Sequence, residues 1–274
     1  SLLINSKKIK SKKFDGIINV LFGGSAENSI ELRKKFKNKI IIEDASHALG
    51  AKYLDGNPVG SCKYSDACVF SFHPVKIITT GEGGALLTNN KRLFNKLNLL
   101  RSHGITRDSK LFTKESDGPW YYQQLMLGYN FRITDIQAAL GISQLDKLDK
   151  FLSIRHEIAS FYDTAFENLP VNIQERNLNN FSSLHLYLIR IDTDSVKLSH
   201  RHIFEFLRNN GIGVNIHYIP IHLQPFYKDM GFKKGDFPNS EYYYDGAISL
   251  PIHPSLTNKE QKKVISVFQD ALKK

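Results

Sequence analysis

The chain has 274 residues, 41% apolar and 23% charged, a composition typical of a globular protein with a full hydrophobic core. Its net charge of +10 would favour an anionic small ligand, but no nucleic-acid module accompanies its short basic runs, so we expect no nucleic-acid partner. No apolar stretch approaches membrane-spanning length and the basic start lacks the apolar core of a signal peptide, so we expect a cytoplasmic protein without a membrane partner.

The first half of the chain alternates short apolar runs with charged, helix-like stretches. Such alternation predicts a doubly wound α/β domain with a mostly parallel sheet. Strands are predicted at 17–21, 39–43, 67–70 and 85–88, and helices at 28–36 and 91–101. The polar stretch 102–122, which contains glycine and proline, predicts a long surface loop.

A strong helix signal begins at Thr134, where Gln137 three residues later completes a capping box. Apolar residues between Ile136 and Leu152 form a stripe along this helix, which we expect to bridge two domains, 1–145 and 146–274. The second domain is predicted to be a smaller α+β unit. Its elements are a strand at 184–191, a helix at 199–210 and a last helix opened by Thr257.

The two cysteines, Cys62 and Cys68, exclude a disulfide framework and are typical of a reducing compartment. Their spacing to the nearby histidines matches no common zinc module, and Cys68 lies within an apolar run where a thiol is usually a small buried hydrophobe. We therefore expect no metal.

Three polar residues near the predicted strand ends suit a pyridoxal phosphate (PLP) site. Asp44 and Lys76 follow two buried strands, so both should emerge at the carboxyl edge of one sheet. A lysine can form a Schiff base with the cofactor aldehyde, and a carboxylate can keep the pyridine nitrogen protonated. Ser71 can donate a hydrogen bond to the phosphate. Taken singly, Lys76 can be a solvated charge and Asp44 a helix N-cap, and only their combination predicts PLP.

Several segments contain recognisable sequence motifs, including EDASHALGA at 43–51, SFHPVK at 71–76 and TTGEGG at 79–84. Others lie at 60–66, 99–104, 128–141, 217–227 and 250–254. Together they resemble the DegT/DnrJ/EryC1/StrS family of PLP-dependent sugar aminotransferases, from about Gly16 to the C-terminus. The resemblance implies the fold-type I (aspartate aminotransferase-like) α/β fold. Residues 1–145 would be the C-terminal part of the large PLP-binding domain, and 146–274 the small domain.

The resemblance also implies roles for single residues. Lys76 would carry the Schiff base and move the proton between substrate and cofactor, which favours transamination over the dehydration seen where a histidine replaces this lysine. Asp44 would pair with the pyridine nitrogen, Ser71 would hold the phosphate, and His47 would lie near the cofactor ring and its phenolic oxygen. Asn130 would reach the phosphate of a neighbouring subunit, which implies a homodimer with shared active sites. By itself, Asn130 can equally be a turn residue after a glycine.

Within the family, the sequence at 71–84 most resembles that of enzymes that aminate C4 of a UDP-linked 4-keto-6-deoxy-N-acetylhexosamine. These enzymes act on the route to pseudaminic acid in bacterial surface-sugar synthesis. L-Glutamate is then the expected amino donor. His217, Tyr218 and His222 are candidates for the wall of the sugar-nucleotide pocket, although these rings can equally form a packed loop.

The chain departs from the family pattern in one respect. Family members begin well upstream, with a segment that supplies a phosphate-binding turn, an aromatic ring that stacks on PLP and much of the dimer contact, and Leu21 stands where relatives usually have histidine. This departure leaves a first alternative, that the chain is a catalytically incompetent fragment with a structural or binding role. A second alternative is a transaminase for another keto sugar, such as a dTDP-linked one, because the sequence determines neither the nucleotide base nor the aminated carbon.

Overall fold

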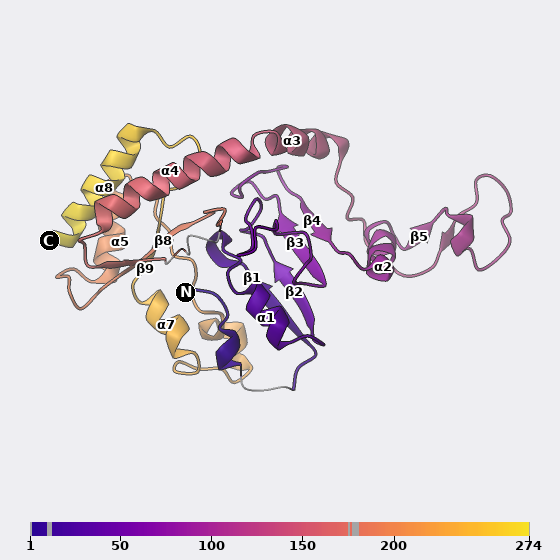
Figure 1. Cartoon of the computed structure of the whole chain (residues 1–274), viewed down its shortest axis with the longest axis horizontal. Coiled ribbons are helices and arrows are strands. Elements are labelled where there is room, and N and C mark those ends of the chain that lie inside the picture. The colour runs from indigo at the N-terminus through magenta and orange to yellow at the C-terminus, as the bar shows by residue number, and fades with distance from the viewer. Residues whose placement is uncertain (1, 10–12, 175, 177–180, 274) are drawn as a thin grey trace.

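The computed structural model describes residues 2–9, 13–174, 176 and 181–273. Its first half contains a four-stranded sheet with the order β1-β2-β3-β4 (Figure 1). The strands are β1 (Gly16–Val20), β2 (Ile40–Asp44), β3 (Ala67–Ser71) and β4 (Gly84–Leu87). The first three are parallel and β4 is antiparallel to β3. The prediction of a mostly parallel sheet is confirmed.

The two faces of this sheet have different surroundings. On one face Ile17 and Ile41 pack with Leu32 of α1 (Ser29–Lys35), and Cys68 and Phe70 belong to a second buried cluster beside them. The opposite face carries exposed apolar side chains at Ile18 (65% exposed), Val20 (44%) and Leu86 (45%). Asp44 and Ser71 share this open face, because the strand register aligns Val20 with Asp44, and Ser71 with Gly84.

Glu43 is a fully buried carboxylate on the packed face of β2. It accepts hydrogen bonds from the hydroxyls of Ser29 (2.5 Å), Tyr53 (2.7 Å) and Ser65 (2.9 Å). Three hydroxyl donors replace the water that a buried carboxylate loses. Glu43 therefore ties β2 to α1 and to the segments that carry Tyr53 and Ser65.

The segment after the sheet extends away from it (Figure 1). The helix predicted at 91–101 is confirmed as α2 (Lys91–Arg101). The predicted loop is largely irregular, but it also contains β5 (Ile105–Thr106), which pairs antiparallel with β6 (Gln123–Gln124). A two-residue strand is too short to show the period-2 alternation that would have predicted it.

The capping box of Thr134 and Gln137 is confirmed, but the helix that it opens is interrupted. Two helices, α3 (Asp135–Leu145) and α4 (Leu148–Phe166), follow each other along one side of the molecule (Figure 1). The prediction of one continuous apolar stripe is wrong, because Ile136 and Leu145 are nine positions apart, about 2.5 helical turns, and therefore lie on opposite sides of the helix. Ile136 is 85% exposed, whereas Leu152 in α4 is buried.

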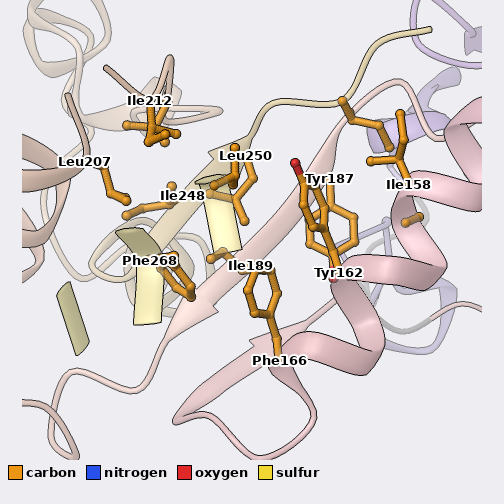
Figure 2. Packing of buried hydrophobic residues seen from close by; sticks show 14 of the residues in the cluster. Ile158, Tyr162, Phe166, Tyr187, Ile189, Leu207, Ile212, Ile248, Leu250 and Phe268 are labelled. Carbon is orange, nitrogen blue, oxygen red and sulfur yellow. The ribbon is translucent and has the colours of Figure 1, made fainter. Parts of the chain in front are cut away.

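The second half forms an antiparallel sheet with the order β7 (Val171–Ile173), β8 (Tyr187–Ile191) and β9 (Ala247–Leu250). This sheet packs with α4, α5 (His200–Asn209) and α8 (Asn258–Lys273) around one apolar core (Figure 2). Phe166 packs edge-to-face on Phe268 with ring centroids 5.1 Å apart, and Tyr162 packs likewise on Tyr187 at 5.0 Å. The strand predicted from residue 184 begins only at Tyr187, since Leu184 has a left-handed backbone with φ of 48°. Two further helices of this half are α6 (Pro225–Asp229) and α7 (Pro238–Tyr244). The described residues also form short 3-10 helices: η1 (Ser6–Lys8), η2 (Phe22–Gly24), η3 (Ser109–Leu111) and η4 (Ile221–Leu223).

The domain boundary predicted after residue 145 falls at the break between α3 and α4. Whether the two parts are separate folding units stays a prediction. Within the described residues, no helix is long and apolar enough to cross a membrane.

The buried carboxylate of Glu43 leads to a stability prediction. Replacing it (Glu43→Ala) leaves three buried hydroxyls without their acceptor, so we expect the free energy of unfolding to fall by about 2 to 4 kcal/mol. Urea denaturation followed by circular dichroism measures this loss. Glu115→Ala, a change at an exposed position, is the control and should alter stability by less than about 0.5 kcal/mol. An equal loss in both variants would contradict the assigned role of Glu43.

Candidate active site

Asp44 and Ser71 end two neighbouring parallel strands at the same edge of the first sheet. The Asp44 carboxylate accepts a hydrogen bond from the backbone N–H of Ser46 (3.0 Å) and closes a short turn. No helix follows, so Asp44 does not act as an N-cap. The Ser71 hydroxyl accepts a weak hydrogen bond from the backbone N–H of His73 (3.4 Å). Both side chains are partly exposed and retain capacity for a ligand.

Lys76 lies in the loop that connects β3 to β4. The loop is closed at its base by the Thr80 N–H, which donates to the Phe72 carbonyl (3.0 Å), and it is anchored by the buried side chains of Ile77 and Ile78. Lys76 itself is half-buried, and this burial lowers the pKa of its ammonium group, while the charge of Asp44 acts in the opposite direction. Since a neutral amine is the nucleophilic form of lysine, partial burial favours covalent chemistry at Nζ.

His47 lies beside these residues in a buried position. Its Nδ1 accepts a long hydrogen bond from the backbone N–H of Gly23 (3.4 Å). Burial lowers the pKa of His47 to about 4, with Lys76 adding to the effect and Asp44 opposing it. The ring is therefore neutral at pH 7, with its proton on Nε2.

The second half of the chain is attached directly to the segments that carry His47 and Gly24. The Ser183 hydroxyl donates to the His47 carbonyl (2.6 Å), and the Ser183 backbone N–H donates to the Gly24 carbonyl (3.1 Å). Gly24 has a φ of 99°, and a Cβ there would lie 2.3 Å from the Ser183 hydroxyl oxygen. Only glycine permits both this backbone conformation and this close approach.

A cleft of about 860 Å³ opens between the two halves, and Lys76 is part of its wall. His217 and Tyr218, two predicted substrate-binding residues, also line it. Ser249 lies 2.7 Å from Nδ1 of His217 and fixes the orientation of its ring, and Tyr218 packs edge-to-face on Phe22. The described residues of the wall include Lys76, Lys150, Arg155, His185, His217 and His253, and none of them is Asp or Glu. Lys150 and Arg155 give this wall positive charge, so the cleft favours an anionic ligand.

Two predicted site residues lie elsewhere. Asn130 is exposed and bridges to Ser102 beside the end of α2, where its side-chain oxygen accepts hydrogen bonds from Arg132 (3.0 and 3.2 Å). His222 is buried, with Nε2 2.7 Å from a carboxylate oxygen of Glu241. Neither lines the cleft. Their roles toward phosphate and substrate stay predictions.

His185, Ser249 and Phe22 contact His47, His217 and Tyr218, respectively, and were not predicted from the sequence. His185 lines the cleft and its ring centroid is 4.4 Å from that of His47. The two histidines are far apart in sequence, so no local spacing could have paired them. The one available signal was a histidine near the start of the apolar run 184–191.

The described residues fit PLP. They bring together a half-buried lysine, a carboxylate and a hydroxyl at adjacent strand ends, and a neutral imidazole. These groups match the aldehyde, pyridine nitrogen, phosphate and ring oxygen of the cofactor. No group of three or more His, Cys, Asp or Glu side chains in the described part of the chain is arranged to hold a metal ion.

Comparison with known sequences gives a consistent result. Residues 4–269 match the DegT/DnrJ/EryC1/StrS aminotransferase family. An uncharacterized protein of Methanocaldococcus jannaschii is 43% identical over 84% of this chain and 59% of its own length. UDP-4-amino-4,6-dideoxy-N-acetyl-beta-L-altrosamine transaminase of Campylobacter jejuni is 39% identical over 99% of this chain and 69% of its own length. The chain thus spans about 59 to 69% of these relatives.

Solved structures agree. Helicobacter pylori PseC, an aminotransferase involved in the biosynthesis of pseudoaminic acid, superposes with a TM-score of 0.88 at 31% identity, over 98% of this chain and 71% of that one. The PLP form of Spr1654 from Streptococcus pneumoniae gives a TM-score of 0.82 at 28% identity, over 94% of this chain and 68% of that one. The predicted α/β fold, that of the fold-type I PLP-dependent transferases, is confirmed.

The neutral histidines predict a pH dependence of stability. The pKa values of His47 and His185 are lowered in the folded chain, so between pH 6.5 and 4 the unfolded chain binds more protons and stability is lost as the pH falls. From pH 7 to 5 we expect a loss of roughly 1 to 2 kcal/mol per histidine. Urea denaturation at both pH values measures it.

The double variant His47→Gln/His185→Asn should remove most of this difference between the two pH values. His202→Asn, on the exposed face of α5, is the matched control and should retain it. The same pH dependence in the double variant and in the unsubstituted chain would show that these two rings are not the groups concerned.

Proposed function

Since the chain belongs to the DegT/DnrJ/EryC1/StrS aminotransferase family, we propose that it carries the site for PLP-dependent transamination of a nucleotide-linked 4-keto-6-deoxy sugar. One observation supports this above others: Lys76, Asp44 and His47 lie at one edge of the sheet, beside a cleft whose described wall has no carboxylate. The same residues that hold the cofactor would therefore face an anionic substrate.

Each of these side chains has a distinct task. Lys76 would bind PLP covalently through Nζ and would hold and move the proton at that atom. Asp44 would accept the N–H of the pyridine ring and keep it protonated, while Ser71 would donate its hydroxyl hydrogen to the phosphate. His47 would donate from Nε2 to the ring oxygen. When bound, PLP supplies the electron sink that allows a proton to leave the carbon bearing the amino group.

The electrostatics of Lys76 suit this task. Burial lowers the pKa of its ammonium group and so increases the neutral fraction, but Asp44 limits the shift. A neutral His47 adds no further positive charge beside the amine. The lowered pKa makes it easier for Lys76 to release a proton and take one up again, as a proton-transfer group must.

The substrate pair that we propose is UDP-4-keto-6-deoxy-N-acetylhexosamine and L-glutamate, in bacterial surface-sugar synthesis. Both compounds are anions, which agrees with a cleft wall that includes Lys76, Lys150 and Arg155. The similarity to the C. jejuni transaminase, 39% identical, supports the UDP-linked sugar. His217 and Tyr218 would contact the sugar nucleotide, whereas Nε2 of His222 already bonds Glu241.

We further propose that two copies of the chain share their sites. Asn130 lies on an exposed surface with Tyr129 (58% exposed) and Phe131 (70%), whose rings stack at 4.7 Å. Exposed apolar surface of this kind is typical of protein interfaces. A second copy bound there would place Asn130 near its cofactor phosphate.

Titration with PLP tests the cofactor site. The chain should develop the visible absorption band of lysine-bound PLP, and borohydride reduction followed by peptide mass mapping should place the adduct on Lys76. Lys76→Ala should lose the band while remaining folded. Lys150→Ala, which removes a different cleft lysine, is the matched control and should retain it. Adducts scattered over surface lysines would instead support a catalytically incompetent fragment.

Turnover with L-glutamate and a UDP-linked 4-keto sugar tests the reaction, with the aminated sugar detected by mass. Lys76→Ala and Asp44→Asn should each reduce the rate on the order of 10³-fold, because the first loses the proton-transfer group and the second the charge that stabilises the protonated pyridine. A dTDP-linked keto sugar is run in parallel. Faster turnover of that substrate would replace the UDP assignment, and an unchanged rate in Lys76→Ala would end the proposal.

A further inference from the structure

His185 is a residue of the cleft wall for which the proposed reaction gives no task. It lies two residues before Tyr187, the first residue of β8, in the second half of the chain, and is 7% exposed. Its ring lies against that of His47, with centroids 4.4 Å apart and planes inclined by 44°. The two rings therefore make the closest described aromatic contact between the two halves of the molecule at this site.

The backbone around His185 is held from two directions. Arg155 of α4 donates through Nη1 to the carbonyls of Leu184 (3.1 Å), His185 (3.3 Å) and Ile252 (2.9 Å). Two residues before His185, Ser183 bonds the carbonyls of His47 and Gly24. The segment cannot shift without breaking these bonds, so the position of the His185 ring relative to His47 is set by the backbone.

The charges around His185 oppose its protonation, and around His47 only the Asp44 carboxylate favours it. The groups that face His185 are His47, Lys76, Arg155 and His217, all of them basic. The groups that face His47 are Lys76, His217 and the carboxylate of Asp44, besides the His185 ring. Within the described residues, Nδ1 of His185 is buried and has no hydrogen-bond partner. A proton on either ring would place a cation against other basic groups without water to solvate it.

We propose that His185 is a positioning residue, whose ring closes the space behind His47 and keeps it a neutral imidazole with the Nε2 hydrogen available to the cofactor. The role of His47 toward the cofactor rests on the proposed function. Its protonation state does not, because that state follows from contacts within the chain.

The physical reason is access of water. The Gly23 N–H donates to Nδ1 of His47, which requires the neutral ring to carry its hydrogen on Nε2. Removing the His185 ring opens room next to His47, and water entering that room solvates the imidazolium form. His47 would then become protonated near Lys76. It could donate a hydrogen bond to the ring oxygen of the cofactor only as a cation, which would add a positive charge beside Lys76.

The test is histidine-selective ¹⁵N NMR of the full chain without PLP, which reports the protonation and tautomer of His47 directly, with its signals assigned through His47→Gln. In the unsubstituted chain we expect a neutral His47 with the hydrogen on Nε2 from pH 8 to 5. His185→Ala should raise the titration midpoint of His47 by at least one pH unit and mix its tautomers. His185→Phe keeps an apolar ring in place and should retain the midpoint and tautomer that His47 has in the unsubstituted chain. His202→Ala on α5 should also leave both unchanged.

If His185→Ala does not fold, His185→Asn is measured instead, because it also removes the ring while retaining polarity. A folded variant without the ring in which His47 keeps its midpoint and tautomer would overturn the proposal. So would a His185→Phe chain that behaves like His185→Ala. Failure of PLP to label Lys76 would count against the proposed function and would leave these titrations unaffected, so the two failures can be told apart.

Discussion

The structure depends above all on the contact of Ser183 with the loop that carries His47. One hydroxyl and one backbone N–H of Ser183 bond the carbonyls of His47 and Gly24, and this pair of bonds joins the second half of the chain to the carboxyl edge of the first sheet. The cleft lies between these halves, so its width depends on how this contact holds them together. Gly24 is essential to it, because a side chain at this position would occupy the space of the Ser183 hydroxyl.

Electrostatics then define what the site can do. The cleft wall described here contains lysine, arginine and histidine but no acid, whereas Asp44 lies just outside it at the strand end. Burial keeps His47 neutral between basic neighbours and lowers the pKa of the Lys76 ammonium group. A site of this kind combines attraction for an anion with a lysine that can lose its proton, two properties that conflict unless water is partly excluded.

The regular elements were largely predictable, since they depend on local pattern. The strands that end at Asp44 and Ser71 follow apolar runs, and the helix at Thr134 follows a capping box, so each signal lies within a few residues of the element it predicts. The start of β8 was predicted wrongly because it depends on contacts that are distant in sequence. Leu184 has an apolar side chain within an apparent strand, but distant partners of its neighbours hold it in a left-handed conformation, and β8 starts later. Local pattern does not contain those partners.

The sequence by itself determined the chemistry of the site: which lysine, acid and hydroxyl follow the strands, and which family the motifs resemble. Tertiary structure alone decided which side chains meet. His185 reaches His47, Ser249 orients His217, and Phe22 packs on Tyr218, although none of these pairs is close in sequence. It also decided that His222 bonds Glu241 and that Asn130 lies away from the cleft. The physical reason is that residue type and strand position are local properties, whereas burial, orientation and pKa arise from neighbours that only the folded chain brings together.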